Sequence, residues 1–371
     1  MAGIYIHIPF CKKACHYCNF HFSTTLTLKN ELLSCIAKEI ELQKNYLDQE
    51  PISSIYFGGG TPSLLSIDQI NEILEKIYSN YKVNKDIEIT FESNPDDLSL
   101  NYCKDLIKFT PINRLSIGIQ SFQEDCLKMM NRAHNSTEAI KAIEYAQSAG
   151  YVNITIDLIY GTPTLSDELW QKNLEIAFGF DIPHLSCYNL TVEENTALSH
   201  FIKKGKQHPV DEIRSNQQFQ ILVEETSKKG YDHYEISNFA KKGFYAFHNS
   251  NYWNGIPYLG IGPAAHSFNG LSRQHNVANN VKYINSLKND TLNFEKEILS
   301  EENIHNEYVM TSLRTIWGCD KTKISKKFFD DFEKKIKTFI VKGWVEAKGN
   351  TYLLTFEGKM FADYISSELF V

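Results

Sequence analysis

Three cysteines lie close together near the start of the chain, in the stretch FCKKACHYCNFHF. Cys11, Cys15 and Cys18 follow the spacing Cys-x3-Cys-x2-Cys, whereas the other cysteines are scattered singly. Single cysteines are typical of small buried apolar side chains. Because packing gives no reason for thiols to cluster on one short segment, the spacing indicates metal or redox chemistry.

Two metal centres suit this cysteine cluster. A zinc ion would take the three thiolates and one imidazole, and a [4Fe–4S] cluster would take the three thiolates and keep one iron open for a small molecule. A disulfide with one thiol left over is disfavoured in a reducing compartment. The histidines near enough in sequence to complete a zinc site are His7, His16 and His21.

Strand-like runs and helical stretches alternate through the first half of the chain, and these elements must position the cysteines. The spacing of apolar residues predicts helices over 66–81 and 136–150, the second capped by Ser136 and stopped by Gly150. Runs rich in Ile, Leu, Tyr and Phe predict six strands. These strands cover residues 3–8, 53–58, 86–92, 114–119, 153–160 and 184–190.

Alternating strands and helices of these lengths predict an α/β fold with a parallel sheet, here a partial (β/α)6 barrel similar to a TIM barrel. Chemistry in such barrels gathers where the strands end. Beyond the cysteines, these ends carry the run Gly58–Ser63, Glu92, Gln120 and Asp157. Because several polar or glycine-rich features follow successive strands, we expect them to form one site.

The pattern changes after about residue 200. A helix over 211–229 and an aromatic, glycine-rich stretch over 231–268 predict an α+β extension. Helices followed by a hairpin around Gly349 predict a small winged-helix-like domain at the end of the chain. We therefore expect three parts, which cover residues 1–200, 201–295 and 296–371.

Composition argues against two classes of partner. The net charge is −7, so the chain lacks the basic footprint of a nucleic-acid-binding protein. No apolar run approaches the ~18 residues of a membrane helix, and the first ten residues lack the basic start of a signal peptide. We expect a cytoplasmic protein with no transmembrane segment and no nucleic-acid partner.

Several motifs together resemble a known family. The cysteine spacing with YIHIPFC, FGGGTPS, ESNP, RLSIGIQSF and TIDLIYGTP is similar to radical S-adenosylmethionine proteins. Within them it resembles the subgroup that contains oxygen-independent coproporphyrinogen III oxidase and the HemW-type haem chaperones, over nearly the whole chain. The resemblance implies a radical S-adenosylmethionine barrel, a [4Fe–4S] cluster and bound S-adenosylmethionine, which one electron from the cluster cleaves to a 5′-deoxyadenosyl radical.

The resemblance also implies roles for single residues. The three clustered cysteines would hold the iron–sulfur cluster. Glu92 or Asp157 can accept hydrogen bonds from ribose hydroxyls or an ammonium group, and Arg132 can pair with a carboxylate. The residues implied to contact S-adenosylmethionine are Tyr5, Gly60, Thr61, Glu92, Gln120, Arg132 and Asp157.

Two features separate the branches of this subgroup. Just past the third cysteine, the oxidases carry a further cysteine, where this chain has Asn19 and Phe20. The oxidases also have a long leader before their first strand, and here that strand starts at about residue 3. Both features favour a HemW-type protein. Oxidative decarboxylation of coproporphyrinogen III to protoporphyrinogen IX is the alternative function.

The segment HNSNYW matches the HNxxYW signature of the HemW-type proteins. His248 can ligate haem iron, and Tyr252 and Trp253 can stack on a porphyrin. The expected function is haem binding and transfer to an acceptor protein, for example a respiratory one, assisted by the cluster and exchangeable S-adenosylmethionine. A homodimer is compatible with this expectation. Further candidate haem ligands are His7, His16, His21 and His266.

Overall fold

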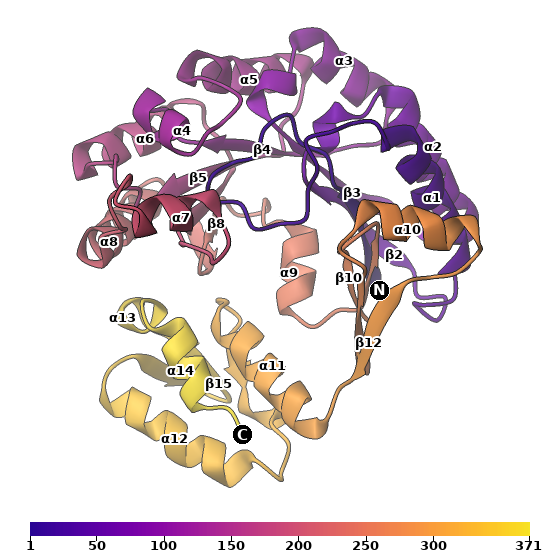
Figure 1. The fold of residues 1–371 in the computed structure, drawn as a ribbon. Helices are drawn as coiled ribbons and strands as arrows, with labels where there is room; N and C mark the ends of the chain where they lie inside the picture. The colour runs from indigo at the N-terminus through magenta and orange to yellow at the C-terminus, as the bar shows by residue number, and fades with distance from the viewer.

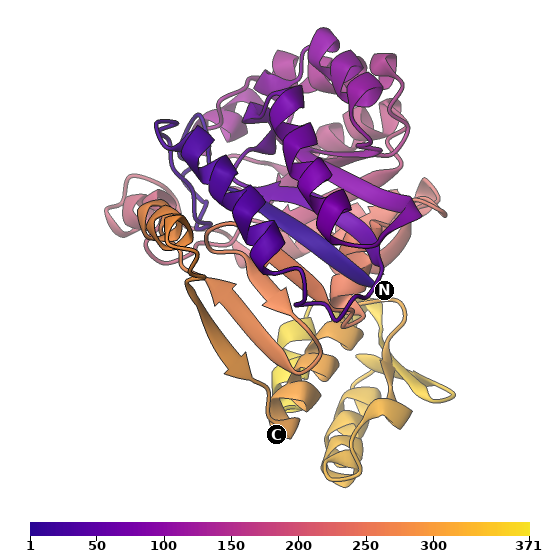
Figure 2. The same ribbon diagram turned by 90° about the vertical axis from the view of Figure 1, so that its right-hand side faces the viewer.

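The computed structural model describes residues 1–371. Its first six strands pair in parallel and curl into a partial barrel, with helices on the outer face (Figures 1 and 2). All six strands predicted from the sequence are confirmed, with small shifts at their ends. They are β1 (Ala2–Ile8), β2 (Ile52–Gly59), β3 (Val83–Ser93), β4 (Arg114–Gln120), β5 (Ile154–Tyr160) and β6 (His184–Asn189).

The helices between these strands bury one apolar face each. The predicted face of α2 is confirmed, because its isoleucines and leucine point into the core. These helices are α1 (Lys29–Leu42), α2 (Ile67–Asn80), α3 (Leu100–Phe109), α4 (Glu124–Met129), α5 (Ser136–Ala149) and α6 (Asp167–Gly179), and after β6 come α7 (Ala197–Lys203) and α8 (Glu212–Lys228). Two 3-10 turns, η1 (Pro62–Leu64) and η2 (Pro95–Asp97), follow β2 and β3.

The N-terminal cap of α5 differs from the prediction. Asn135, not Ser136, is the cap: its side chain accepts from the Glu138 N–H, and the Glu138 carboxylate accepts from the Asn135 N–H, each at 2.9 Å. Ser136 instead donates to Glu124, 2.7 Å away, a contact between elements that local spacing does not reveal. The predicted stop is confirmed, because Gly150 adopts a left-handed φ of 105°.

The second half of the chain extends the sheet at both edges. β9 (Tyr258–Ile261) pairs in parallel with β1, whereas β8 (Asn238–Ala240) pairs antiparallel with β6. Beyond β8 lies the edge strand β7 (Asp232–Glu235), and beyond β9 follow β10 (His266–Phe268), β11 (Ser272–Asn276) and the other edge strand, β12 (Phe294–Ile298). Because β7 and β12 do not pair, the barrel stays open, and α9 (Phe247–Trp253) lies in the opening (Figure 1).

The molecule has two hydrophobic cores. The larger, of 62 buried residues, includes side chains from both the barrel strands and the segment after residue 200, and α10 (Asn280–Lys288) packs on α1 beside it. The smaller, of 13 buried residues, lies in the helices and short strands after residue 300, which both views place below the barrel. No helix in the structure combines the length and apolar character needed to cross a lipid bilayer.

The C-terminal part contains the predicted hairpin. Its two strands pair antiparallel around Gly349, and a third short strand joins them. The elements are α11 (Glu301–Leu313), β13 (Cys319–Asp320), η3 (Lys321–Lys323), α12 (Phe329–Val341), β14 (Val345–Lys348), β15 (Thr351–Leu354), α13 (Phe356–Lys359) and α14 (Ala362–Glu368). The winged-helix likeness and the boundaries of the three parts stay predictions.

Candidate functional site

The cysteine loop follows β1 and is pinned by several elements. The Cys11 N–H donates to the Ser23 carbonyl at 3.0 Å, and the His16 ring bonds the Met129 carbonyl at the end of α4 at 2.8 Å. The Leu198 N–H of α7 donates to the His16 carbonyl at 2.8 Å. All three clustered cysteines are free thiols and partly exposed. The fold therefore presents them together at the carboxyl end of the barrel.

A chain of hydrogen bonds links two of these sulfurs. The Thr61 hydroxyl donates to Cys11 Sγ at 3.5 Å, and Arg132 Nη1 donates to Cys15 Sγ at 3.4 Å. Asn94 joins them, because its Nδ2 donates to Thr61 at 3.0 Å and its Oδ1 accepts from Arg132 at 2.7 Å. Sequence reasoning missed Asn94 as a site residue, although it lies in the ESNP block. Donors aimed at sulfur stabilise thiolates, so these residues fit an iron–sulfur cluster.

The histidines near the cysteines are engaged elsewhere. His7 Nε2 bonds the His21 carbonyl at 3.0 Å, and His21 Nε2 bonds Asn280 at 2.7 Å. No three His, Cys, Asp or Glu side chains surround a point that would suit one metal ion. Burial raises the pKa of Cys11 to about 11, so a metal bond would have to supply its ionisation.

The glycine run at the end of β2 lies against other atoms of the protein. A Cβ at Gly60 would lie 2.7 Å from backbone atoms of Ile8 and Phe10, and one at Gly59 would lie 2.5 Å from the His7 ring. Glycine is required there because β1 and the cysteine loop approach the backbone closely.

A cavity of about 930 Å³ lies inside the barrel. Among the predicted site residues, its walls include both S-adenosylmethionine candidates and haem candidates. The cysteine loop contributes Asn19 and Phe20 to its mouth. Predicted residues on its walls are Tyr5, Glu92, Asp157, His248 and Tyr252, together with the further haem-ligand candidates His7, His21 and His266.

The other S-adenosylmethionine candidates, Gly60, Thr61, Gln120 and Arg132, do not line this cavity. The first two and Arg132 surround the cysteine loop, as described above. Gln120 ends β4 with a left-handed φ of 63°, beside the guanidinium of Arg132 near Gly118. A left-handed non-glycine residue stores strain that often marks a functional site.

Burial controls the charge of two carboxyl groups on the cavity wall. Burial raises the pKa of Glu92 to about 7, against hydrogen bonds from Tyr56 at 2.7 Å and the Gly59 N–H at 3.2 Å. Burial likewise raises the pKa of Asp157 to about 6, although nearby Arg114 and Arg132 lower it. Both groups can therefore change protonation near neutral pH.

His248 is held in one orientation on the cavity wall. Its Nδ1 is hydrogen-bonded to the Ser54 hydroxyl at 2.8 Å, and its ring packs on Tyr56 with centroids 5.1 Å apart. The Glu88 carboxylate accepts from the His248 N–H at 2.9 Å and so anchors α9. A Cβ at Gly3 would lie 3.2 Å from the imidazole, so glycine leaves space for it. The other ring nitrogen, Nε2, makes no hydrogen bond with the protein.

The two aromatic residues of the HNxxYW segment point to different places. Tyr252 lines the cavity, whereas Trp253 does not. Trp253 instead packs under the guanidinium of Arg314, 5.2 Å from its ring centre, at the end of α11. In this structure, Tyr252 alone of the pair is placed to stack on a ligand.

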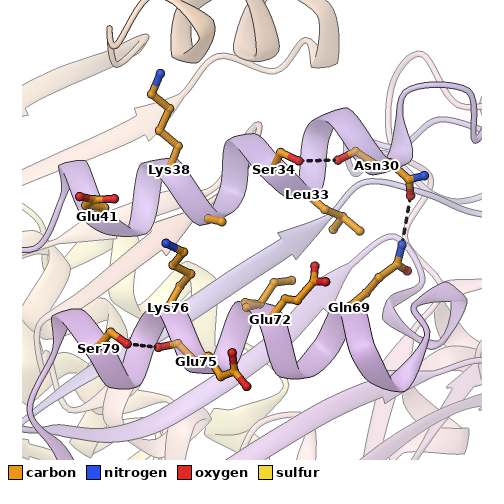
Figure 3. Close-up of a pocket in the computed structure, with 12 residues that line it drawn as sticks. Asn30, Leu33, Ser34, Lys38, Glu41, Gln69, Glu72, Glu75, Lys76 and Ser79 are labelled. Carbon is orange, nitrogen blue, oxygen red and sulfur yellow. Dashed lines mark hydrogen bonds between the residues drawn. The ribbon is translucent and has the colours of Figure 1, made fainter.

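A second groove, of about 760 Å³, lies outside the barrel between α1 and α2 (Figure 3). Its walls carry mixed charges, and a 3.1 Å hydrogen bond from Gln69 to Asn30 spans the two helices. It contains none of the predicted site residues.

A partial parallel barrel with three free cysteines after its first strand defines a radical S-adenosylmethionine protein. The model of the radical SAM superfamily matches residues 5–176. The chain is 31% identical to the haem chaperone HemW of Bacillus subtilis, over 98% of both chains. It is 33% identical to the haem chaperone HemW of Buchnera aphidicola (strain Sg), over 97% of this chain and 96% of that protein.

The fold is also similar to coproporphyrinogen III oxidase (HemN) of Escherichia coli. The TM-score is 0.86 at 22% identity, over 100% of this chain and 90% of that one. The chain therefore belongs to the radical SAM superfamily, in the subgroup of oxygen-independent coproporphyrinogen III oxidase and the HemW-type haem chaperones, and is closest there to the HemW type. Membership of this superfamily implies a [4Fe–4S] cluster and S-adenosylmethionine.

Proposed function

We propose that the protein binds haem in the barrel cavity and passes it to an acceptor protein. The observation that carries this proposal is His248. Its Nδ1 is held by Ser54, so Nε2 remains available to an iron atom. Tyr252 and Phe20, on the same cavity, supply aromatic surface for a flat macrocycle. The relatives named as haem chaperones support this proposal over their whole length.

In this proposal, Cys11, Cys15 and Cys18 hold the cluster. When bound, the cluster supplies the electron that can cleave the carbon–sulfur bond of S-adenosylmethionine. Glu92 accepts hydrogen bonds from its ribose or ammonium group. Arg132 spends both Nη atoms on protein partners, and its buried Nε is the donor that remains unpartnered. The residues proposed to surround S-adenosylmethionine are Tyr5, Gly60, Thr61, Glu92, Gln120, Arg132 and Asp157.

Haem titration tests the main proposal. The cluster-reconstituted protein should give a Soret band that saturates near one haem per chain. The variant His248→Ala should shift that band and weaken binding by about tenfold or more, because the axial ligand is lost. The matched control is His208→Ala, which removes an exposed imidazole in the loop before α8, outside the cavity. An unchanged free-haem spectrum with wild-type protein would reject haem binding.

A specific observation keeps coproporphyrinogen oxidation as a second candidate. The cavity that carries His248 and Tyr252 also carries Tyr5, Glu92 and Asp157, so a porphyrinogen there would lie beside the S-adenosylmethionine candidates. Anaerobic turnover with reductant, S-adenosylmethionine and coproporphyrinogen III tests it. Absence of any vinyl product from protein with an intact cluster would exclude this activity. A respiratory acceptor, a homodimer and a cytoplasmic location remain part of the proposal.

A further inference from the structure

Arg114 lies on the cavity wall, and the protein supplies hydrogen-bond partners for only part of its guanidinium. Its side chain is 2% exposed and belongs to β4, which turns Arg114 and Ser116 toward the cavity and Leu115 toward the core. The Thr155 hydroxyl is the one hydrogen-bond partner of its guanidinium. Its Nε is buried and has no partner at all. Burying an ionised donor without a partner is unfavourable, so the site is incomplete without a further acceptor.

The acidic neighbours of Arg114 do not accept a hydrogen bond from its Nε. The Glu88 carboxylate lies 3.9 Å from Nε, beyond hydrogen-bond distance. Its two oxygens accept instead from the Phe247 and His248 N–H groups, each at 2.9 Å. Asp157 accepts from a serine hydroxyl of β4 at 3.5 Å. These carboxylates offset the charge of Arg114, but none of their oxygens reaches the free Nε.

The neighbouring imidazole adds no competing charge. His184 lies on the same wall, with Nε2 hydrogen-bonded to the Tyr234 hydroxyl at 2.7 Å and with Nδ1 unpartnered. Burial, and next Arg114, hold the pKa of His184 well below its usual value. His184 is therefore neutral at physiological pH, so this wall presents a single permanent cation.

The other cation of the cavity is already occupied. Arg114 and Arg273 are the only Lys or Arg side chains on the cavity wall. Arg273 forms a two-pronged ion pair with Glu307, at 2.5 and 2.8 Å, and also donates to the Tyr258 hydroxyl at 3.3 Å. The guanidinium of Arg273 is therefore already paired within the protein, and Arg273 provides a matched control.

We propose that Arg114 binds a carboxylate side arm of the porphyrin ligand. This inference rests on the proposed function, because haem carries two such propionate arms. The position suits it: Glu88 bridges the backbone of His248 and the edge of Arg114, so the proposed iron ligand and the proposed carboxylate site lie in one part of the cavity. A charge-assisted bond from a planar guanidinium fixes the rotation of the macrocycle as well as its affinity.

Esterified haem tests the proposal directly on the full-length, cluster-reconstituted protein. Affinities for haem and for haem dimethyl ester are measured in the same detergent-containing buffer. Wild type should prefer haem by roughly 10- to 100-fold, the range of a hydrogen bond to a charged group. In Arg114→Gln the preference should fall close to one, and in Arg114→Lys to an intermediate value. In Arg273→Gln it should match wild type.

The outcomes separate this inference from the haem proposal. Equal wild-type binding of haem and its ester, or an unchanged preference in Arg114→Gln, would overturn the carboxylate site and leave haem binding standing. Binding of neither compound by wild type would reject both. Because the ester comparison needs no variant, a misfolded Arg114→Gln would not prevent the decision. A parallel titration with coproporphyrin III shows whether the carboxylate belongs to haem or to the substrate of the alternative function.

Discussion

Burial inside the cavity raises the pKa of its carboxyl groups. Glu92 has a folded-state pKa raised by burial from 4.5 to about 7. A carboxyl raised in this way contributes stability below its unfolded pKa, and that contribution is lost as the pH rises through the folded value. In the protein without ligands, an ionised Glu92 inside the barrel therefore lowers the free energy of unfolding. Binding of a donor, such as a ribose hydroxyl or an ammonium group, would offset this cost.

The variant Glu92→Gln should change the pH dependence of stability. A shift from 4.5 to about 7 corresponds to a loss of about 3 kcal/mol between those pH values. Glutamine cannot ionise. The free energy of unfolding of the variant, relative to that of wild type, should therefore rise by up to that amount between about pH 5 and about pH 8. Urea unfolding at both pH values measures it.

The control for this experiment is Glu144→Gln on the exposed face of α5. It should leave the pH profile as in wild type. Parallel profiles for wild type and Glu92→Gln would show that the Glu92 carboxyl does not titrate between these pH values.

The cysteine loop depends on close contact between elements. The loop leaves β1 at the point where the end of β2 presses on it, and Gly60 allows that approach. Lys12 of the loop pairs with Asp96 at 2.8 Å and with Asp97 in η2. The register of β1 on β2, with Ile8 opposite Gly59, therefore sets where the thiols stand.

The variant Gly60→Ala should lower the iron content of the reconstituted protein. Its Cβ would meet the backbone of Ile8 and Phe10 at 2.7 Å, and the cysteine loop would have to move. Overpacking of this kind costs about 1–3 kcal/mol. Gly179→Ala in α6 is the matched control, because its Cβ meets nothing within 4 Å, and it should keep the iron and stabilise the protein by up to about 1 kcal/mol. Full iron loading of Gly60→Ala would contradict this role of the β2 end.

At the scale of the whole molecule, the C-terminal part contacts the barrel through polar and aromatic side chains. Arg314, at the end of α11, pairs with Asp363 at 2.6 Å and lies 3.6 Å from Glu235 of β7. It also covers the ring of Trp253. The helix that carries His248 thus touches the C-terminal part through Trp253.

The variant Phe332→Ala should destabilise the C-terminal core alone. Phe332 is fully buried in the 13-residue core. Removing such a side chain costs about 3–5 kcal/mol. Hydrogen exchange should therefore rise after residue 300 while the barrel strands stay protected. Val341→Ala, at a position 89% exposed, should change neither region. Equal loss of protection in β1 to β6 would show that the two cores unfold as one.

Much of the fold, and the family, could be predicted from the sequence alone. The six barrel strands, the α2 face and the Gly349 hairpin were predicted because they depend on local periodicity and turn chemistry. The cysteine spacing and its neighbouring motifs pointed to the family, which the full-length relatives confirmed. The cap of α5 was misassigned because Asn135 and Ser136 can both cap, and a distant Glu124 decided between them.

Contacts between distant residues settled the rest. Ser54 meets His248, Asn94 joins Thr61 to Arg132, and each pair is far apart in the sequence. Gly60 has to be glycine because the backbone of Ile8 and Phe10 lies beside it. Linear order records spacing within a segment, but which side chains share a dry cavity depends on strand register and helix packing. Residue types therefore named the chemistry, and the folded barrel set which atoms stand together and which are left without a partner.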